Sequence, residues 1–323
     1  MYLYDLIAKT DLSIFPVIAG HQTGPRRELG RTRAAGIAAM LGGAVRYKID
    51  NVAHYYWQSE DAGPGSWLLS DPRYFPSLAP PHPLTWLEYE MTPRIRLESG
   101  WSYHSPYVGV YIGALVSAID RTPDKEHFFS EVNDDIKWFL QGFLFSYSSR
   151  RREWLFNCEF RQAVHSDGSP PESNEMPYSL VRTAPPDRPE LADAAQQHVK
   201  PFLLAFSFLA AKNTIIVDHD PRPRKPRKSD AKKRRSGTSY KTLEIRPLAD
   251  VLRVRGLRRA QPNGRPSATG PGLKKIAITR GHFRTYTETG KGLFGRGIYG
   301  TFWVPSHVRG RGNQSDRDRE IKL

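Results

Sequence analysis

Two aromatic stretches, IKWFLQGFLFSY (136–147) and EWLFNCEFRQAV (153–164), decide the fold. Aromatic and β-branched residues favour strands because they pack well on a pleated surface. The basic segment SSRRR (148–152) separates the two stretches and has the length of a turn. Paired runs of this kind predict a long β-hairpin. We expect this hairpin to form part of a mostly antiparallel, aromatic-rich sheet.

Six other stretches are expected to be strands of this α+β fold. In LTWLEYEM (84–91), residues alternate in direction, so that Glu88 and Glu90 share one strand face. The apolar run TIIV (214–217) predicts a short buried strand. The remaining strands are expected at 107–118, 241–246, 274–287 and 298–304.

Two to three helices complete the expected fold. The stretch PRRELGRTRAAGIAAML (25–41) has strong helix formers in its second half and ends at a pair of glycines. A second helix is expected to begin at Asp187 in a capping-box pattern. Pro201 should kink or split this helix, because proline lacks the amide hydrogen and clashes with the preceding turn. Asn213 is a candidate for a left-handed cap at its end.

Length and composition indicate one large domain or two smaller ones among the 323 residues. Cys158 is the single cysteine, so neither an intrachain disulfide nor a cysteine zinc site can form. The first residues show no basic segment followed by an apolar one, which a secretory signal requires. The longest apolar run, FLLAFSFLAA (202–211), is about half the length that spans a bilayer. We expect a soluble cytoplasmic protein.

The charge is unevenly distributed along the chain. Residues 1–220 hold 21 Lys and Arg against 26 Asp and Glu, a net charge of −5. Residues 221–323 hold 27 against 7, a net charge of +20. A near-neutral body followed by a basic third predicts a polyanionic partner, and nucleic acid is the leading candidate. The alternatives are an acidic protein or membrane surface, and a solvated tail with no specific partner.

These charges suggest three parts. Residues 1–220 are expected to be an α+β body, and residues 242–323 a basic, β-rich region that completes the same fold. Between them, 221–241 holds ten Lys and Arg, one acidic residue and three prolines. Such a composition cannot bury a core, so we expect a disordered basic linker. Its densest cluster of cations, expected to contact the phosphates of RNA or DNA, is Lys232, Lys233, Arg234 and Arg235.

The expected strand 274–287 carries the most informative pattern. Because strand side chains alternate, one face would present Arg280, His282, Arg284 and Tyr286. Arginine suits phosphate, while Tyr286 and Trp303 could stack on the bases of a single strand. The glycines of this region could allow phosphate to approach the backbone closely. Further cations expected to bind nucleic acid are Lys291, Arg296, Arg309 and Arg311.

The same residues suggest a second function, metal-independent cleavage of RNA. His282 and His307 would act as acid and base, since histidine titrates near neutral pH. Tyr286 could donate its hydroxyl, while arginines 280, 284 and 309 would stabilise the charge on the phosphorane. This hypothesis requires the two imidazoles to lie within reach of one phosphate.

No metal site or cofactor is predicted. Asp218, His219 and Asp220 include suitable ligand types, but no second ligand cluster accompanies them, so a polar loop is favoured. Glu88 and Glu90, with the Glu-Ile-Arg sequence at 244–246, partly resemble the acidic-x-Lys element of restriction-type nucleases. Arginine stands where that element has lysine, so these acids are expected to be surface carboxylates.

The segment RGHFRTYTETGKGLFGRGIYGTFWVPSHVRG (280–310) resembles the C-terminal region of a group of uncharacterised bacterial, plasmid and phage-encoded proteins. The block 201–217 and the segment KTLEIRP (241–247) are similar to the same group. The resemblance covers about the last 120 residues. It implies a setting of mobile elements and nucleic acid, and it carries over no activity and no catalytic residue.

Overall fold

The chain has an α+β fold in a computed structural model. By contacts it divides into two compact units, residues 1–210 with 216–244 and residues 211–215 with 245–323, which are described separately below. Among the described residues, no helix combines the length and apolar character that crossing a bilayer requires. The structure describes residues 2–19, 26–60, 71–91, 109–122, 124–125, 134–171, 179–184, 189–219, 239–245, 277–279, 281–304 and 307–309.

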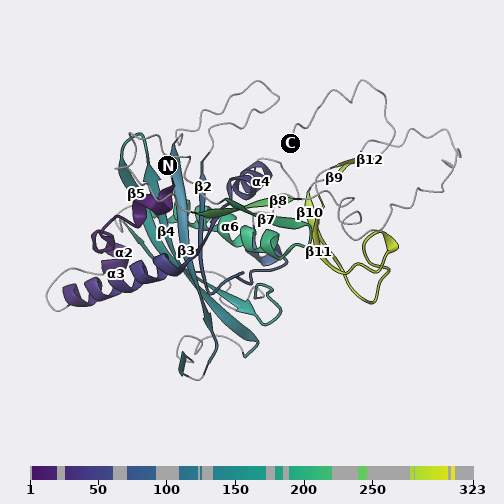
Figure 1. The fold of residues 1–323 in the computed structure, drawn as a ribbon, viewed down its shortest axis with the longest axis horizontal. Helices are drawn as coiled ribbons and strands as arrows, with labels where there is room; N and C mark the ends of the chain where they lie inside the picture. The colour runs from purple at the N-terminus through teal and green to yellow at the C-terminus, as the bar shows by residue number, and fades with distance from the viewer. Residues whose placement is uncertain are drawn as a thin grey trace, which may run out of the picture. The chain divides into compact units, whose positions relative to one another are not determined.

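An eight-stranded mixed sheet with the order β6-β5-β4-β3-β2-β1-β8-β7 is the main element (Figure 1). The neighbours from β2 to β6 pair antiparallel, whereas β1 pairs in parallel with both β2 and β8. The strands expected at 84–91, 107–118 and 241–246 are confirmed. The strand bounds are β1 (Val45–Lys48), β2 (Leu84–Glu90), β3 (Val110–Asp120), β4 (Ile136–Ser148), β5 (Glu153–His165), β6 (Ser179–Ala184), β7 (Thr214–His219) and β8 (Tyr240–Ile245).

The predicted aromatic hairpin is confirmed as β4 and β5, which pair along nearly their whole length. Phe143 and Phe145 of β4 point into one apolar cluster. Gly142, which precedes Phe143 in β4, lies opposite Phe160 of β5. The Phe160 ring occupies the space that a side chain at position 142 would need. Cys158 is buried as expected, and burial raises the pKa of its thiol.

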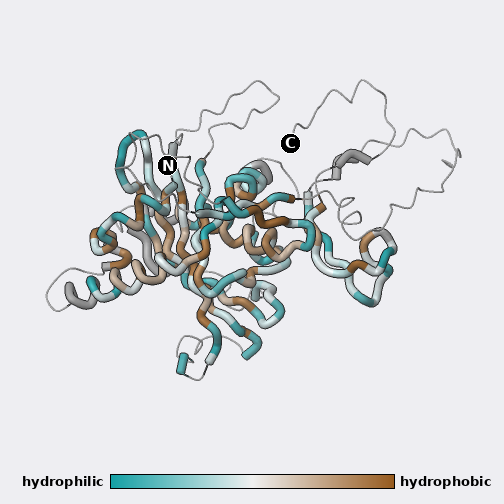
Figure 2. Tube along the Cα trace, viewed as in Figure 1, coloured by the Kyte–Doolittle hydropathy of each residue, from teal (hydrophilic) through white to brown (hydrophobic). Residues whose placement is uncertain are grey.

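Helices cover both faces of the sheet. On one face, α1 (Leu3–Ile7), α2 (Pro16–Ala19) and α3 (Arg26–Gly43) pack over β2 to β5 around Trp86. Helices α4 (Asp50–Glu60) and α6 (Pro189–Ala210) pack against each other and against the sheet. Figure 2 shows α6 and the middles of the central strands as the more hydrophobic segments. The expected helix 25–41 is confirmed as α3, and Arg33 pairs with the buried Glu159 of β5 at 2.6 Å.

Two local expectations are wrong, and a third is wrong in part. Helix α6 continues through Pro201, so the proline does not split it, and the kink stays a prediction. Asn213 does not have the positive φ that a left-handed cap requires. Its side chain instead donates one hydrogen bond to the backbone of Trp303 and accepts one from it. Strand β7 is not buried: it forms the edge of the sheet, and Ile216 is 42% exposed.

A pH-dependent stability follows from His198 on α6. Its Nδ1 lies 2.9 Å from the Tyr89 hydroxyl, and burial lowers the pKa of His198 to about 4. The unfolded chain therefore takes up a proton between about pH 6.5 and 4 that the folded chain excludes. We expect this residue to remove about 3 kcal/mol from the free energy of unfolding as the pH falls through that window.

Chemical denaturation of the His198→Gln variant at pH 7 and pH 4.5 measures this contribution. The variant should lose less stability than the wild type over that interval. His54→Gln is the matched control, because His54 is exposed on α4. Equal losses for the wild type and His198→Gln would contradict the assignment.

Candidate nucleic-acid interface

The second unit contains a hairpin of β10 (His282–Tyr286) and β11 (Gly300–Val304). These strands pair antiparallel, with His282 opposite Val304 and Arg284 opposite Phe302. The expected single strand 274–287 is wrong, because it divides into β9 (Ala277–Thr279) and β10. Strand β9 pairs with a different strand, β12 (His307–Arg309).

Arg284 is the best-defined cation of the hairpin. Its guanidinium lies 4.9 Å from the centre of the Tyr286 ring, and its side chain is exposed. Among the described residues it forms no ion pair with a carboxylate. A phosphate can therefore approach Arg284 without displacing an acidic partner.

Tyr286 has a structural role that its sequence position does not reveal. It packs against a small apolar cluster of Leu293, Ile298 and Phe302, and its ring meets Phe302 edge to face at 5.9 Å. The Arg284 guanidinium lies over the same ring. A base could therefore stack only on the part of the Tyr286 ring that these neighbours leave exposed.

The glycine-rich loop between β10 and β11 is closed by its own backbone. Leu293 and Ile298 are joined by a hydrogen bond from the Leu293 amide to the Ile298 carbonyl at 2.8 Å. Gly292 has φ of 70°, and a Cβ there would lie 2.6 Å from the Ile298 nitrogen. The fold itself therefore requires this glycine. The loop holds Lys291 and Arg296 at the surface, where both are exposed.

Trp303 cannot stack on a base, which corrects that part of the prediction. It is 1% exposed, and its ring packs against Phe283 at 4.9 Å. A Cβ on Gly281 would lie 2.5 Å from the Trp303 ring, so the indole fills the space beside this glycine. Hydrogen bonds of 2.8 and 2.9 Å to the Asn213 side chain fix the backbone of Trp303.

The other predicted residues are only partly described. His282 lies in β10 and is half-buried, whereas His307 and Arg309 lie in β12, which pairs with β9. The side chains of His307 and Arg309 lie outside the described residues, so the proximity of the two imidazoles stays a prediction. Also outside the described residues are Arg280, Arg311, Lys232, Lys233, Arg234 and Arg235.

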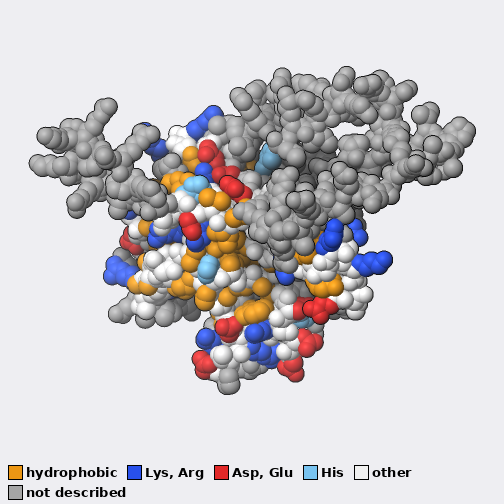
Figure 3. Space-filling model, turned by 45° about the vertical axis from the view of Figure 1, so that its right-hand side comes forward, with side chains coloured by type: hydrophobic (Ala, Val, Ile, Leu, Met, Phe, Trp, Pro, Cys, Tyr) orange, Lys and Arg blue, Asp and Glu red, His pale blue; other side chains and the backbone are white. Residues whose placement is uncertain are grey.

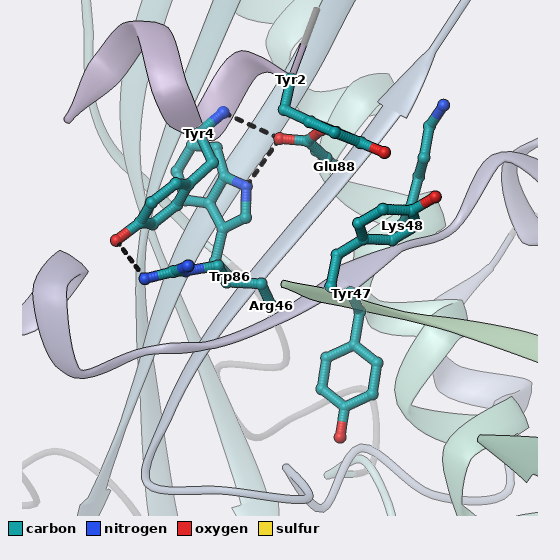
Figure 4. Close-up of a pocket in the computed structure, with 8 residues that line it drawn as sticks. Tyr2, Tyr4, Arg46, Tyr47, Lys48, Trp86 and Glu88 are labelled. Carbon is teal, nitrogen blue, oxygen red and sulfur yellow. Dashed lines mark hydrogen bonds between the residues drawn. The ribbon is translucent and has the colours of Figure 1, made fainter. Parts of the chain in front are cut away.

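The body of the protein buries a carboxylate that the sequence placed at the surface. Glu88 of β2 is 6% exposed, and one of its oxygens accepts hydrogen bonds from the Tyr4 amide and the Trp86 indole, both at 2.9 Å (Figure 4). Burial raises the pKa of Glu88, against the effect of these donors and of Lys48. Glu88 therefore anchors the start of α1 on the sheet. The surface interpretation is wrong for this residue.

Strand β1 carries two cations on the same face as Glu88. The guanidinium of Arg46 lies 3.8 Å from the centre of the Tyr4 ring, and its Nη2 donates to the Tyr4 hydroxyl at 2.8 Å (Figure 4). Lys48 pairs with Asp50 at 3.1 Å. Burial disfavours the charged form of Lys48, but Asp50, Glu88 and Glu90 outweigh it and raise the pKa. Lys48 thus remains charged at neutral pH.

Three rings adjoin these cations at the edge of the sheet. The ring centres of Tyr240 in β8 and His219 in β7 are 4.8 Å apart, and the two rings are 12° from parallel. The ring centre of Tyr240 lies 4.7 Å from that of Tyr2. The His219 Nε2 is 2.7 Å from the Thr242 hydroxyl, which fixes the imidazole on the sheet. All three rings are half-exposed. We call Tyr2, Tyr240 and His219 the ring stack.

The expected polar loop at 218–220 is wrong for its first two residues, since both belong to β7. Asp218 forms an ion pair with Lys241 of β8, and Asp220 lies outside the described residues. Among the described residues, no three carboxylate, imidazole or thiol groups converge in an arrangement that would hold a metal ion.

A hollow of about 310 Å³ lies beside the ring stack, where β1 and β8 begin and β7 ends. The residues that line it include Arg46, His219, Tyr240 and the Asp218–Lys241 pair. The volume falls in the range of small-ligand sites, about 300–1,000 Å³. A second and much smaller cavity, of about 10 Å³, lies between Tyr2, Tyr4 and Glu88 and has room for about one water molecule.

Sequence reasoning did not find the ring stack or the hollow. The available signal was the alternation in YKTLEI (240–245), which places Tyr240 and Thr242 on one strand face. The rings come together only because β8 pairs with β1 and β7 closes the edge. Comparisons with protein-family models, with curated proteins and with solved structures gave no match.

Proposed function

We propose that this protein binds nucleic acid through its basic C-terminal third. The observation that carries the proposal is the charge imbalance, −5 over residues 1–220 against +20 over residues 221–323. On the face in Figure 3, acidic and basic side chains are interspersed over the described residues. A surface of that kind has little long-range attraction for a polyanion, so the basic third would supply most of it.

The hairpin of the second unit supports the proposal. It presents Arg284, Lys291 and Arg296 at its surface, on a rigid frame fixed by a small apolar cluster. Rigid presentation lowers the entropy that binding must overcome. The chain also leaves the sheet after His219 and returns before Tyr240, so the cationic segment between them is attached beside the ring stack.

Binding takes precedence over cleavage, because the charge distribution supports contact with phosphate, whereas cleavage also requires an acid and a base placed at one phosphate. Cleavage of RNA stays a hypothesis that a decay assay on the His282→Ala variant checks. We expect the protein to act in the cytoplasm, in the setting of a plasmid, phage or other mobile element that the resemblance of residues 280–310 implies.

Fluorescence anisotropy of the full chain with labelled oligonucleotides tests the proposal. Single-stranded RNA, single-stranded DNA and duplex DNA of equal length are titrated at 50 mM salt, with polyglutamate of matched charge as competitor. We expect saturable oligonucleotide binding that polyglutamate displaces poorly. Failure of every oligonucleotide to bind would overturn the proposal, and equal displacement by polyglutamate would favour the acidic-protein alternative.

A further inference from the structure

Arg284 and Tyr286 form a pair at the surface of the hairpin in the second unit. The two residues are two positions apart in β10, so their side chains project from the same face of the strand. The guanidinium of Arg284 lies over the Tyr286 ring, 4.9 Å from its centre. Arg284 is exposed, and among the described residues no carboxylate forms an ion pair with it. One side of the guanidinium therefore faces the tyrosine, and its exposed surface is on the side away from the ring.

Tyr286 is a fixed support for this guanidinium. Its ring packs against Leu293, Ile298 and Phe302, and it meets the buried Phe302 ring edge to face at 5.9 Å. The hydrogen bond from the Leu293 amide to the Ile298 carbonyl closes the loop that completes this cluster. The Tyr286 ring cannot turn away without opening the cluster, so it restricts the orientations of Arg284. A side chain that is ordered before binding loses less entropy when a ligand arrives.

The chemistry of a guanidinium held in this way differs from that of a simple cation. The group is flat, its charge is delocalised and it is weakly hydrated, so its faces stack on aromatic rings. Its N–H donors lie in the plane and point outward from the rim, where they suit phosphate oxygens. Unpaired bases of single strands stack on guanidinium planes as well as on aromatic side chains. In a duplex the faces of the bases are already covered by their neighbours.

We propose that an unpaired base of a single-stranded nucleic acid stacks on the outer face of the Arg284 guanidinium, with Tyr286 as the positioning residue beneath it. The proposal rests on the proposed function and names the class of nucleic acid that the hairpin binds. Lys291 and Arg296 are exposed in the loop of the same hairpin and supply cations for neighbouring phosphates. The Tyr286 hydroxyl has no part in this arrangement, since the ring alone supports the guanidinium.

Stacking and phosphate contact are separable by experiment. The full chain is titrated with a single-stranded oligonucleotide and with an abasic oligonucleotide that has the same number of phosphates. The wild type should bind the intact strand more tightly. Arg284→Lys keeps the charge but has no flat group, so this preference should fall by about 2- to 30-fold, the range for a cation against a ring. The affinity of Arg284→Lys for the abasic strand should stay nearly unchanged.

Three further variants sharpen the result. Arg150→Lys is the matched control, because Arg150 is exposed in the turn between β4 and β5, and it should keep the full preference. Tyr286→Phe keeps the ring and should also keep it. Tyr286→Leu retains an apolar contact with Phe302 but removes the ring, so it should lower the preference. In the Arg284→Lys background, Tyr286→Leu should have no further effect on the preference, which a purely structural role would not predict.

The outcomes separate this inference from the proposed function. An unchanged preference in Arg284→Lys would overturn the inference, even where the chain binds both strands. Equal weakening of both strands would assign Arg284 to phosphate alone and would overturn it as well. Adenosine monophosphate that competes as effectively as the strand would assign the pair to a free nucleotide and contradict the single-strand proposal. Failure of the wild type to bind either strand would instead overturn the proposed function.

Discussion

Replacing Lys232, Lys233, Arg234 and Arg235 together by glutamine is expected to weaken single-strand binding by roughly 10²–10³-fold at 100 mM salt. Each phosphate contact with a single strand releases about 0.7 counterion, which contributes about fivefold in affinity at that salt concentration. The effects of four lost contacts on the affinity multiply, which gives the expected range. Anisotropy titration of the variant and the wild type measures the ratio.

The control for this result removes the same charge from the body. Lys9, Lys137, Arg150 and Arg151 are exposed and lie outside the proposed contact regions. Their joint replacement by glutamine lowers the net charge equally, and we expect it to change the affinity much less. Equal weakening by both sets would mean that only net charge matters, and that residues 232–235 make no specific contribution.

Gly142→Ala is expected to lower the free energy of unfolding by about 3 kcal/mol or more. A Cβ at this position would lie 2.0 Å from Cζ of Phe160. Phe160 is 0% exposed, so its ring has no open space into which it could move. To relieve this clash, β4 or β5 would have to shift, and these are the two strands of the aromatic hairpin. Urea denaturation followed by circular dichroism measures the change.

Gly36→Ala is the matched control for this substitution. Gly36 lies in α3 and is exposed, and a Cβ there meets no atom within 4 Å. Alanine in a helix should raise the free energy of unfolding by about 0.5–1 kcal/mol, because glycine is the poorer helix former. A Gly142→Ala protein as stable as the wild type would show that the packing of Phe160 over β4 is wrong.

The elements that local patterns determine were predictable from the sequence. The hairpin of β4 and β5 follows from two aromatic runs around one turn, and α3 follows from its composition. Strands at 274–287 and 298–304 were also expected, although the first was expected to be continuous and divides into β9 and β10. In each case the deciding residues are close together in the chain.

The features that were missed depend on residues far apart in the chain. Glu88 is buried because Tyr4, 84 residues earlier, supplies a backbone donor. Asn213 binds the backbone of Trp303, 90 residues later, and so does not act as a helix cap. The ring stack likewise requires the N-terminus, β7 and β8 to meet. Local periodicity carries no information on contacts between residues that are far apart in the chain.

The salt dependence of single-strand affinity tests the central claim most directly. Anisotropy titrations of the full chain between 50 and 200 mM salt give the slope of log K against log salt. Contact with six to ten phosphates predicts a slope of about −4 to −7, a loss of roughly 10²–10⁴ in affinity over that range. A slope near zero, or no measurable binding at 50 mM salt, would contradict nucleic-acid binding through the basic third.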